Sequence, residues 1–116
     1  MAGMAQGPDF KLVVRDVQAG DDAVWVGVAG VLGLDELQLL TEAVAQLAQG
    51  EDGTRRVVLD LSGVSYCSRD SAFALWGMCA GFEAMGVRAR LAEVSTMARI
   101  AVVGARLNKR FSFLER

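Results

Sequence analysis

The chain has 116 residues, of which 53% are hydrophobic and 22% are charged, and its formal net charge is −2. This length predicts one globular domain, and the slightly acidic balance argues against a nucleic-acid-binding protein. The sequence contains two cysteines and no histidine, which excludes a standard zinc site and any Ser-His or Cys-His catalytic pair within the chain. We therefore expect no metal, no cofactor and no enzyme activity, and a reducing, cytoplasmic location with both thiols buried.

The N-terminal region is expected to contain a flexible tail followed by a β-hairpin. Residues 1–9 hold no apolar cluster and no charge run, so we assign them to the tail and residues 10–116 to the domain. Apolar residues over 10–17 and 24–28 flank the turn-type sequence Gln-Ala-Gly-Asp-Asp, which indicates a hairpin. Gly30 is expected to end the second strand.

A helix and a buried strand should come next. Asp35 with Gln38 three residues later has the spacing of a capping box, and Gly50 is expected to end the helix. Apolar residues at helical spacing mark its inner face: Leu37, Leu40, Val44 and Leu47. A β-branched run over 56–61 predicts a strand, and the intervening helix makes a parallel crossover from the hairpin the natural connection.

The strand over 56–61 is followed by a turn at Ser62-Gly63 and then by a helix with almost no charge. A polar cluster opens this helix: Ser68, Arg69, Asp70 and Ser71. The sequence between Asp70 and Glu83 carries no charged residue. One face should lie on the sheet: Ala72, Leu75, Cys79 and Phe82. The opposite face is also apolar, so we expect it to bind a protein partner or a second copy of the chain: Phe73, Trp76, Gly77 and Ala80.

The C-terminal region predicts a strand, a short helix and a last strand. Alternating residues over 87–91 indicate a strand with one wet face. Ser95 is expected to cap a helix that runs through Val103. Its inward residues should be Met97, Ile100 and Val103. Alternation over 110–113 predicts the final strand.

The sequence from Asp60 to Val64, Asp-Leu-Ser-Gly-Val, and the polar motif that follows it resemble the STAS domain. The best-known members of that family are anti-sigma-factor antagonists, in which a Ser or Thr of an Asp-Ser-Ser-Gly or Asp-Ser-Thr-Gly motif is phosphorylated by a partner kinase. Aligned without gaps, with the helix-ending glycine of the family on Gly86, the motif falls on Ser68–Ser71 and the phosphorylated position on Asp70. A shifted register, which needs a two-residue insertion, would match Asp70-Ser71 to the Asp-Ser of the motif.

The resemblance implies an α/β fold with a mostly parallel sheet of about five strands, begun by a hairpin, and helices packed mainly on one side. It also implies that the loop from Gly30 to Asp35 lies on a partner-binding surface. The expected function is regulation by binding an anti-sigma factor of the serine-kinase type, without membrane insertion. The alternative is a constitutive STAS subunit docked on the ATPase of an ABC transporter or in a larger scaffold. Asp70 leaves the phosphorylation switch of the family open, because aspartate has no hydroxyl to phosphorylate.

Overall fold

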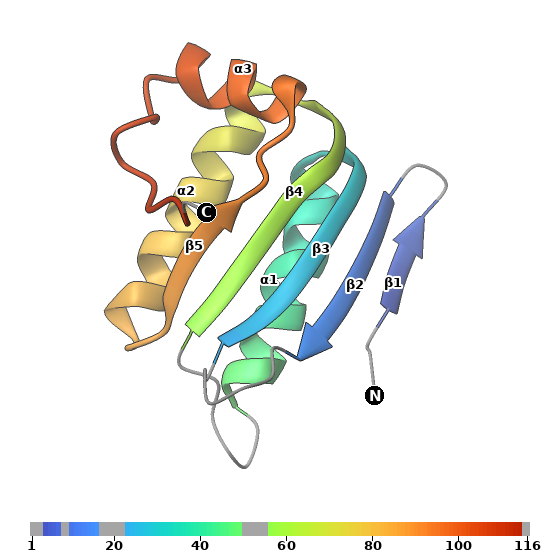
Figure 1. The fold of residues 1–116 in the computed structure, drawn as a ribbon, viewed down its shortest axis with the longest axis vertical. Coiled ribbons are helices and arrows are strands. Elements are labelled where there is room, and N and C mark those ends of the chain that lie inside the picture. The colour runs from blue at the N-terminus through green and yellow to red at the C-terminus, as the bar shows by residue number, and fades with distance from the viewer. Residues whose placement is uncertain (1–3, 8–9, 17–22, 50–55, 115–116) are drawn as a thin grey trace.

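In the computed structural model of the chain, residues 4–7, 10–16, 23–49 and 56–114 are described. They form a five-stranded sheet with the order β1-β2-β3-β4-β5 (Figure 1). The strands are β1 (Met4–Gly7), β2 (Phe10–Asp16), β3 (Ala23–Leu32), β4 (Arg56–Cys67) and β5 (Arg88–Ala92). The helices are α1 (Leu34–Ala48), α2 (Arg69–Ala84) and α3 (Thr96–Gly104).

The sheet changes from antiparallel to parallel pairing at β3. Strands β1, β2 and β3 pair antiparallel, whereas β3, β4 and β5 pair parallel because α1 and α2 carry the chain back between them. The α/β class and the opening hairpin are therefore confirmed. The connection within the hairpin, residues 17–22, lies outside the described residues.

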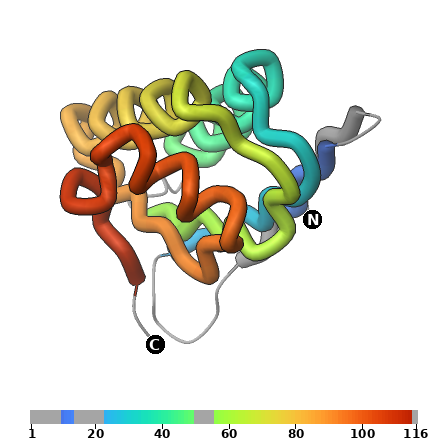
Figure 2. Tube along the Cα trace, turned by 90° about the horizontal axis from the view of Figure 1, so that it is seen from above, coloured from blue at the N-terminus to red at the C-terminus, as the bar shows by residue number. Residues whose placement is uncertain are grey.

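Two helices cover one face of the sheet, and the third lies at its end. Figure 2 shows α1 and α2 side by side in one layer, with α3 across the carboxyl end of β4. The main core fills the space between this layer and the sheet, and its largest fully buried side chains are leucines: Leu12, Leu32, Leu40, Leu59, Leu61, Leu75 and Leu91. No helix within the described ranges is both long and apolar enough to cross a membrane.

The N-terminal segment differs from the flexible tail that the sequence predicts. Residues Met4–Gly7 form β1 and pair antiparallel with β2, from Met4 opposite Val13 to Gly7 opposite Phe10. Pairing with an exposed strand edge needs only backbone hydrogen bonds, which explains why an uncharged, non-periodic segment can extend the sheet. The remaining residues of the expected tail, 1–3 and 8–9, lie outside the described residues.

Strands β3 and β4 are both longer than predicted, because glycines expected to end them are accommodated within the sheet. Gly30 has a φ of 95° and marks one of two register shifts in β3, which continues to Leu32. Gly63 stays within β4, where a Cβ atom would lie 2.7 Å from the Cβ of Ala29. The expected turn at Ser62-Gly63 is therefore wrong: the missing side chain allows a close approach of two strands.

Helix α1 begins one residue before Asp35, and its cap differs from the predicted one. Gly33 is the N-cap residue, and its N–H donates to Oε1 of Glu36 at 3.2 Å. Asp35 thus lies in the first turn rather than at the cap, where its charge still complements the helix dipole. Helical residues end at Ala48, and Gly50 lies outside the described residues.

The cap of α3 is as predicted, but its buried face is not. Ser95 is the N-cap, and its hydroxyl also donates to the Val64 carbonyl at 2.7 Å, which ties the start of α3 to β4. This close attachment favours small residues on the inner face: Ala98, Ala101 and Val102 are buried. The residues predicted to face inward are exposed instead: Met97, Ile100 and Val103.

The predicted last strand over 110–113 is reduced to a single bridge. Residues 108–110 form a turn, and only Phe113 pairs with β5, in parallel, opposite Leu91. Two backbone hydrogen bonds hold this segment beside β5, from Leu91 N–H to the Ser112 carbonyl at 2.9 Å and from Leu114 N–H to the Leu91 carbonyl at 2.8 Å.

Substitution of Gly63 tests the close approach of β3 and β4. Gly63→Ala should lower the free energy of unfolding by about 1–3 kcal/mol, because the added methyl group would overlap Ala29 and crowd the Val28 carbonyl. Gly77→Ala on α2 is the matched control, since a Cβ there meets no atom within 4 Å. It should raise stability by about 1 kcal/mol through helix propensity. Urea unfolding of both variants measures the difference, and equal effects would contradict the proposed packing.

Candidate functional site

The candidate site lies at the edge of the sheet where β3 and β4 end. Leu32 and Cys67 pair as the last residues of these parallel strands. Each is followed after one residue by a helix, so the N-termini of α1 and α2 open at the same edge (Figure 1). The structure thereby brings together the expected partner-binding segment Gly30–Asp35 and the expected phosphorylation motif Ser68–Ser71.

Two serines form the hydrogen-bonded turn that begins α2. Ser68 is the N-cap residue, and its Oγ accepts the Ser71 N–H at 3.1 Å. The Ser68 hydroxyl also donates to Oγ of Ser71 at 3.0 Å. Ser71 is only 2% exposed, whereas Ser68 is half-buried. Both hydroxyls therefore serve the start of the helix, and that of Ser71 is closed to solvent.

The two charged residues of the motif point away from the core. Asp70 is exposed in the first turn of α2, where a carboxylate complements the positive end of the helix dipole. The side chain of Arg69 runs against α3, with its Cδ 3.5 Å from the position of a Cβ on Gly104. The motif thus offers one exposed carboxylate at the start of α2 and one exposed arginine whose aliphatic stem lies against α3.

The apolar side of α2 is only partly the surface that the sequence predicts. Phe73 is 49% exposed, and Gly77 and Ala80 are exposed with it. Trp76 is different: it is half-buried, packs against the main core, and has the guanidinium of Arg110 at 5.7 Å from its ring centroid. Residues four apart lie on one helix face, so Phe73 stands one turn beyond Arg69 on the same side of α2. The exposed aromatic residue of α2 is therefore Phe73 alone.

Sequence reasoning missed four exposed apolar side chains around this edge. Leu34 and Tyr66 are 59% and 52% exposed at the start of α1 and the end of β4. Ile100 and Val103 are 59% and 53% exposed on α3. Ile100 precedes Gly104 by one turn, and Gly104 contacts Arg69, so Ile100 and Phe73 both lie within a turn of that contact. The alternation along β4 could have identified Tyr66, but the orientation of α3 follows from its attachment to β4.

Both cysteines lie behind this surface as buried free thiols. Burial raises the pKa of the Cys67 thiol, and burial together with the nearby Glu83 carboxylate raises the pKa of Cys79 to about 12. A raised pKa keeps both groups as unreactive thiols near neutral pH. The expectation that both cysteines are buried is confirmed, and neither thiol has the character of a nucleophile.

Solved structures of similar fold were found, although no protein-family model and no curated protein sequence matches the chain. An anti-sigma factor antagonist from Mycobacterium paratuberculosis is 19% identical, with 97% of this chain and 92% of that chain covered and a TM-score of 0.69. The unphosphorylated anti-sigma factor antagonist SpoIIAA is 15% identical, with 92% and 89% covered and a TM-score of 0.63. A variant of RsbS from Moorella thermoacetica is 16% identical, with 90% and 86% covered and a TM-score of 0.67. The chain therefore has the STAS fold of anti-sigma-factor antagonists, as its sequence predicted.

The serine pair provides a test of the local structure of the site. Ser68→Ala should lower the free energy of unfolding by about 1–3 kcal/mol, because it removes the cap and the hydrogen bond to a buried hydroxyl. Ser68→Asp should retain most of that stability, since a carboxylate can also accept the Ser71 N–H. The exposed Ser65→Ala on β4 is the control and should change stability by less than about 0.5 kcal/mol. Thermal and urea unfolding measure all three, and a neutral Ser68→Ala would contradict the capping role.

Proposed function

We propose that the chain is a cytoplasmic regulatory protein that binds an anti-sigma factor of the serine-kinase type. The observation that carries the proposal is an exposed aromatic residue, Phe73, one turn from the Ser68–Ser71 motif on a helix whose solvent side has no charge up to Glu83. Aromatic side chains exposed within an apolar surface are typical anchors of protein interfaces. The likeness of the fold to anti-sigma-factor antagonists supports the same class of partner.

The binding surface comprises the edge where α1 and α2 begin and the adjoining side of α3. Its apolar contributors are Leu34, Tyr66, Phe73, Ile100 and Val103. The exposed charged residues Asp35, Arg69 and Asp70 lie in the first turns of α1 and α2 and supply a polar rim. Apolar anchors with a polar rim are the common composition of a specific protein interface. We therefore assign recognition to this edge, with Gly77 and Ala80 extending it along α2.

Phosphorylation is not expected to control this binding. A phosphoryl group carries about one and a half to two negative charges and would disturb docking at an apolar surface. The family position is Asp70, which offers no hydroxyl, and the neighbouring hydroxyl of Ser71 is buried. The Ser68 hydroxyl is used by the helix cap. The partner is therefore proposed to accept a permanent single negative charge at this position.

A second candidate is a constitutive subunit docked on a transporter ATPase. The exposed glycines of α2 favour it, because Gly77 and Gly81 have open space around them and would let a partner helix approach closely. A second copy of this chain could use the same face. The gene neighbourhood separates the two hetero-partners: an anti-sigma kinase gene supports the first proposal and an ATPase-permease operon the second.

Phe73 and Trp76 distinguish the binding surface from the core. Phe73→Ala should weaken binding to the cognate kinase-type anti-sigma factor by at least about 2 kcal/mol, a roughly thirtyfold loss, while leaving the unfolding midpoint nearly unchanged. Trp76→Ala should mainly lower stability, because that ring packs against the core. Titration calorimetry with the anti-sigma factors of the source organism gives the binding constants.

Met85→Ala is the control for Phe73→Ala, since Met85 is more exposed and lies past the other end of α2. It should bind as the wild type does. Equal binding by the wild type and Phe73→Ala would contradict the proposed surface. Sedimentation of the protein alone, with Ala80→Glu for comparison, distinguishes a homodimer through α2.

Restoring a hydroxyl at the family position tests the absent switch. The wild type should bind its partner without phosphatase treatment and should gain no phosphate from that partner with ATP. Asp70→Ser should bind within several-fold of the wild type and become a kinase substrate, because the residue is exposed at the helix start. Intact-protein mass spectrometry measures the phosphate. Stoichiometric phosphate on Ser68 or Ser71 of the wild type would show that the switch uses a neighbouring hydroxyl.

A further inference from the structure

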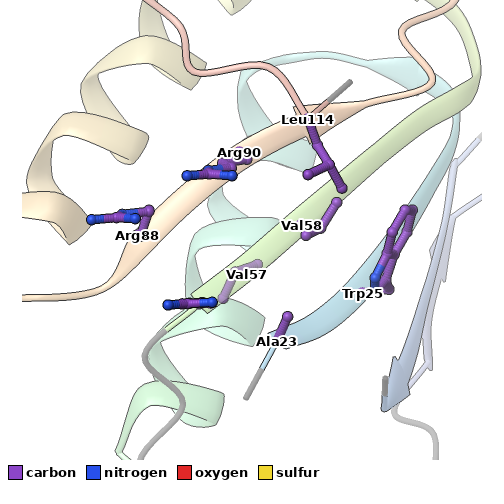
Figure 3. Close-up of a pocket in the computed structure, with 8 residues that line it drawn as sticks. Ala23, Trp25, Val57, Val58, Arg88, Arg90 and Leu114 are labelled. Carbon is purple, nitrogen blue, oxygen red and sulfur yellow. The ribbon is translucent and has the colours of Figure 1, made fainter. Parts of the chain in front are cut away.

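The sheet face opposite α1 and α2 carries a second, separate apolar cluster. Side chains alternate along a strand, and on this face the buried members are Ala23, Val58 and Ala92. Trp25 and Leu114 pack against them from β3 and from the C-terminal segment. Figure 3 shows Val58 and Leu114 between Trp25 on one side and two arginines of β5 on the other. The cluster therefore forms the apolar part of a pocket.

Three arginines line the same pocket from adjacent strands. Arg88 and Arg90 are two residues apart on β5 and so lie on one face of the sheet. Arg56 is the Cα partner of Arg88, and Val58 is the partner of Arg90. Like charges directly opposite each other on neighbouring strands are destabilising. Such a grouping is favourable where an anion lies among the guanidinium groups.

Among the described residues that line the pocket, none is acidic. The pocket is about 200 Å³ in volume, and arginines and apolar residues alone line it. Among the residues that the structure describes, the side chains of Arg88 and Arg90 make no hydrogen bond or ion pair. Asp60, one cross-strand pair farther along the sheet, uses its carboxylate to accept the Ser62 N–H at 3.0 Å. The charges of Arg88 and Arg90 are thus available to a ligand.

We propose that this pocket binds a small organic anion. A carboxylate or phosphate head would lie between Arg88 and Arg90, because guanidinium groups bind both anions through paired, charge-assisted hydrogen bonds. The apolar body would lie on Val58 and Leu114, beside the ring of Trp25. Ligand sites combine apolar walls with a few polar groups in this way. The site is on the sheet face, away from the edge assigned to the protein partner, and does not depend on that assignment.

Titration of the full chain with defined probes tests the site. Phenyl phosphate and benzoate carry the two possible head groups on one apolar body, whereas benzyl alcohol lacks the charge and inorganic phosphate lacks the ring. Nuclear magnetic resonance should show saturable shifts of the Trp25 indole and of the Val58 and Leu114 amides with at least one anionic aromatic probe. Inorganic phosphate and benzyl alcohol should each bind more weakly. The relative affinity of phenyl phosphate and benzoate identifies the preferred head group.

A pair of double variants separates specific binding from general charge attraction. R88Q/R90Q should weaken the binding of the aromatic anion at least about tenfold. R99Q/K109Q removes the same charge from exposed positions elsewhere and should leave that affinity unchanged. Unfolding midpoints confirm that both variants are folded. Equal weakening by both pairs, or the absence of saturable shifts at Trp25 up to about 10 mM of either anion, would overturn the proposal.

Discussion

The close approach of β3 and β4 is the constraint on which the candidate site depends. Gly63 has no side chain where Ala29 lies against it, and the irregular register of β3 lets both strands continue to their paired ends at Leu32 and Cys67. Each strand is then followed almost at once by a helix. The N-termini of α1 and α2 therefore open side by side, with their orientation set by a parallel strand pair and not by flexible loops. The rigidity of the surface comes from the backbone, whereas its chemistry comes from the few residues that follow each strand.

The sequence predicted the fold well where periodicity and burial agree. The inner faces of α1 and α2 are as expected, because leucines and other apolar residues at helical spacing leave one orientation on the sheet. The predictions were wrong where a glycine is compatible with either the end or the interior of a strand. Gly30 and Gly63 were expected to end strands, yet both lie within them, since glycine suits a bulge or a close approach as well as a turn. Whether a glycine forms a turn, a bulge or a close approach depends on which strand lies beside it, and the local sequence does not give that strand.

The residues of the candidate site could also be predicted only in part. The polar motif was found by its likeness to a family, and the structure places its four residues at the start of α2. The separate roles of Phe73 and Trp76 could not be predicted, because both lie on a helix that is apolar on every face. Contact with the core and with Arg110 covers Trp76, and these contacts come from distant parts of the chain. The exposed residues of α3 were missed for a similar reason, since two hydrogen bonds from Ser95 to β4 determine which face turns inward.

The segment from Ser112 to Leu114 has a consequence for the solution behaviour of the protein. Its hydrogen bonds use both the N–H and the carbonyl of Leu91, so it occupies part of the outer edge of β5. Without it, that edge would present unpaired N–H and C=O groups to other molecules. At the opposite edge, β1 is only four residues long. A sheet whose two outer strands are short or covered offers little template for edge-to-edge pairing between molecules. Residues 112–114 thus cover a hydrogen-bonding edge, and their removal would expose that edge beside the apolar cluster of Ala23, Val58 and Ala92.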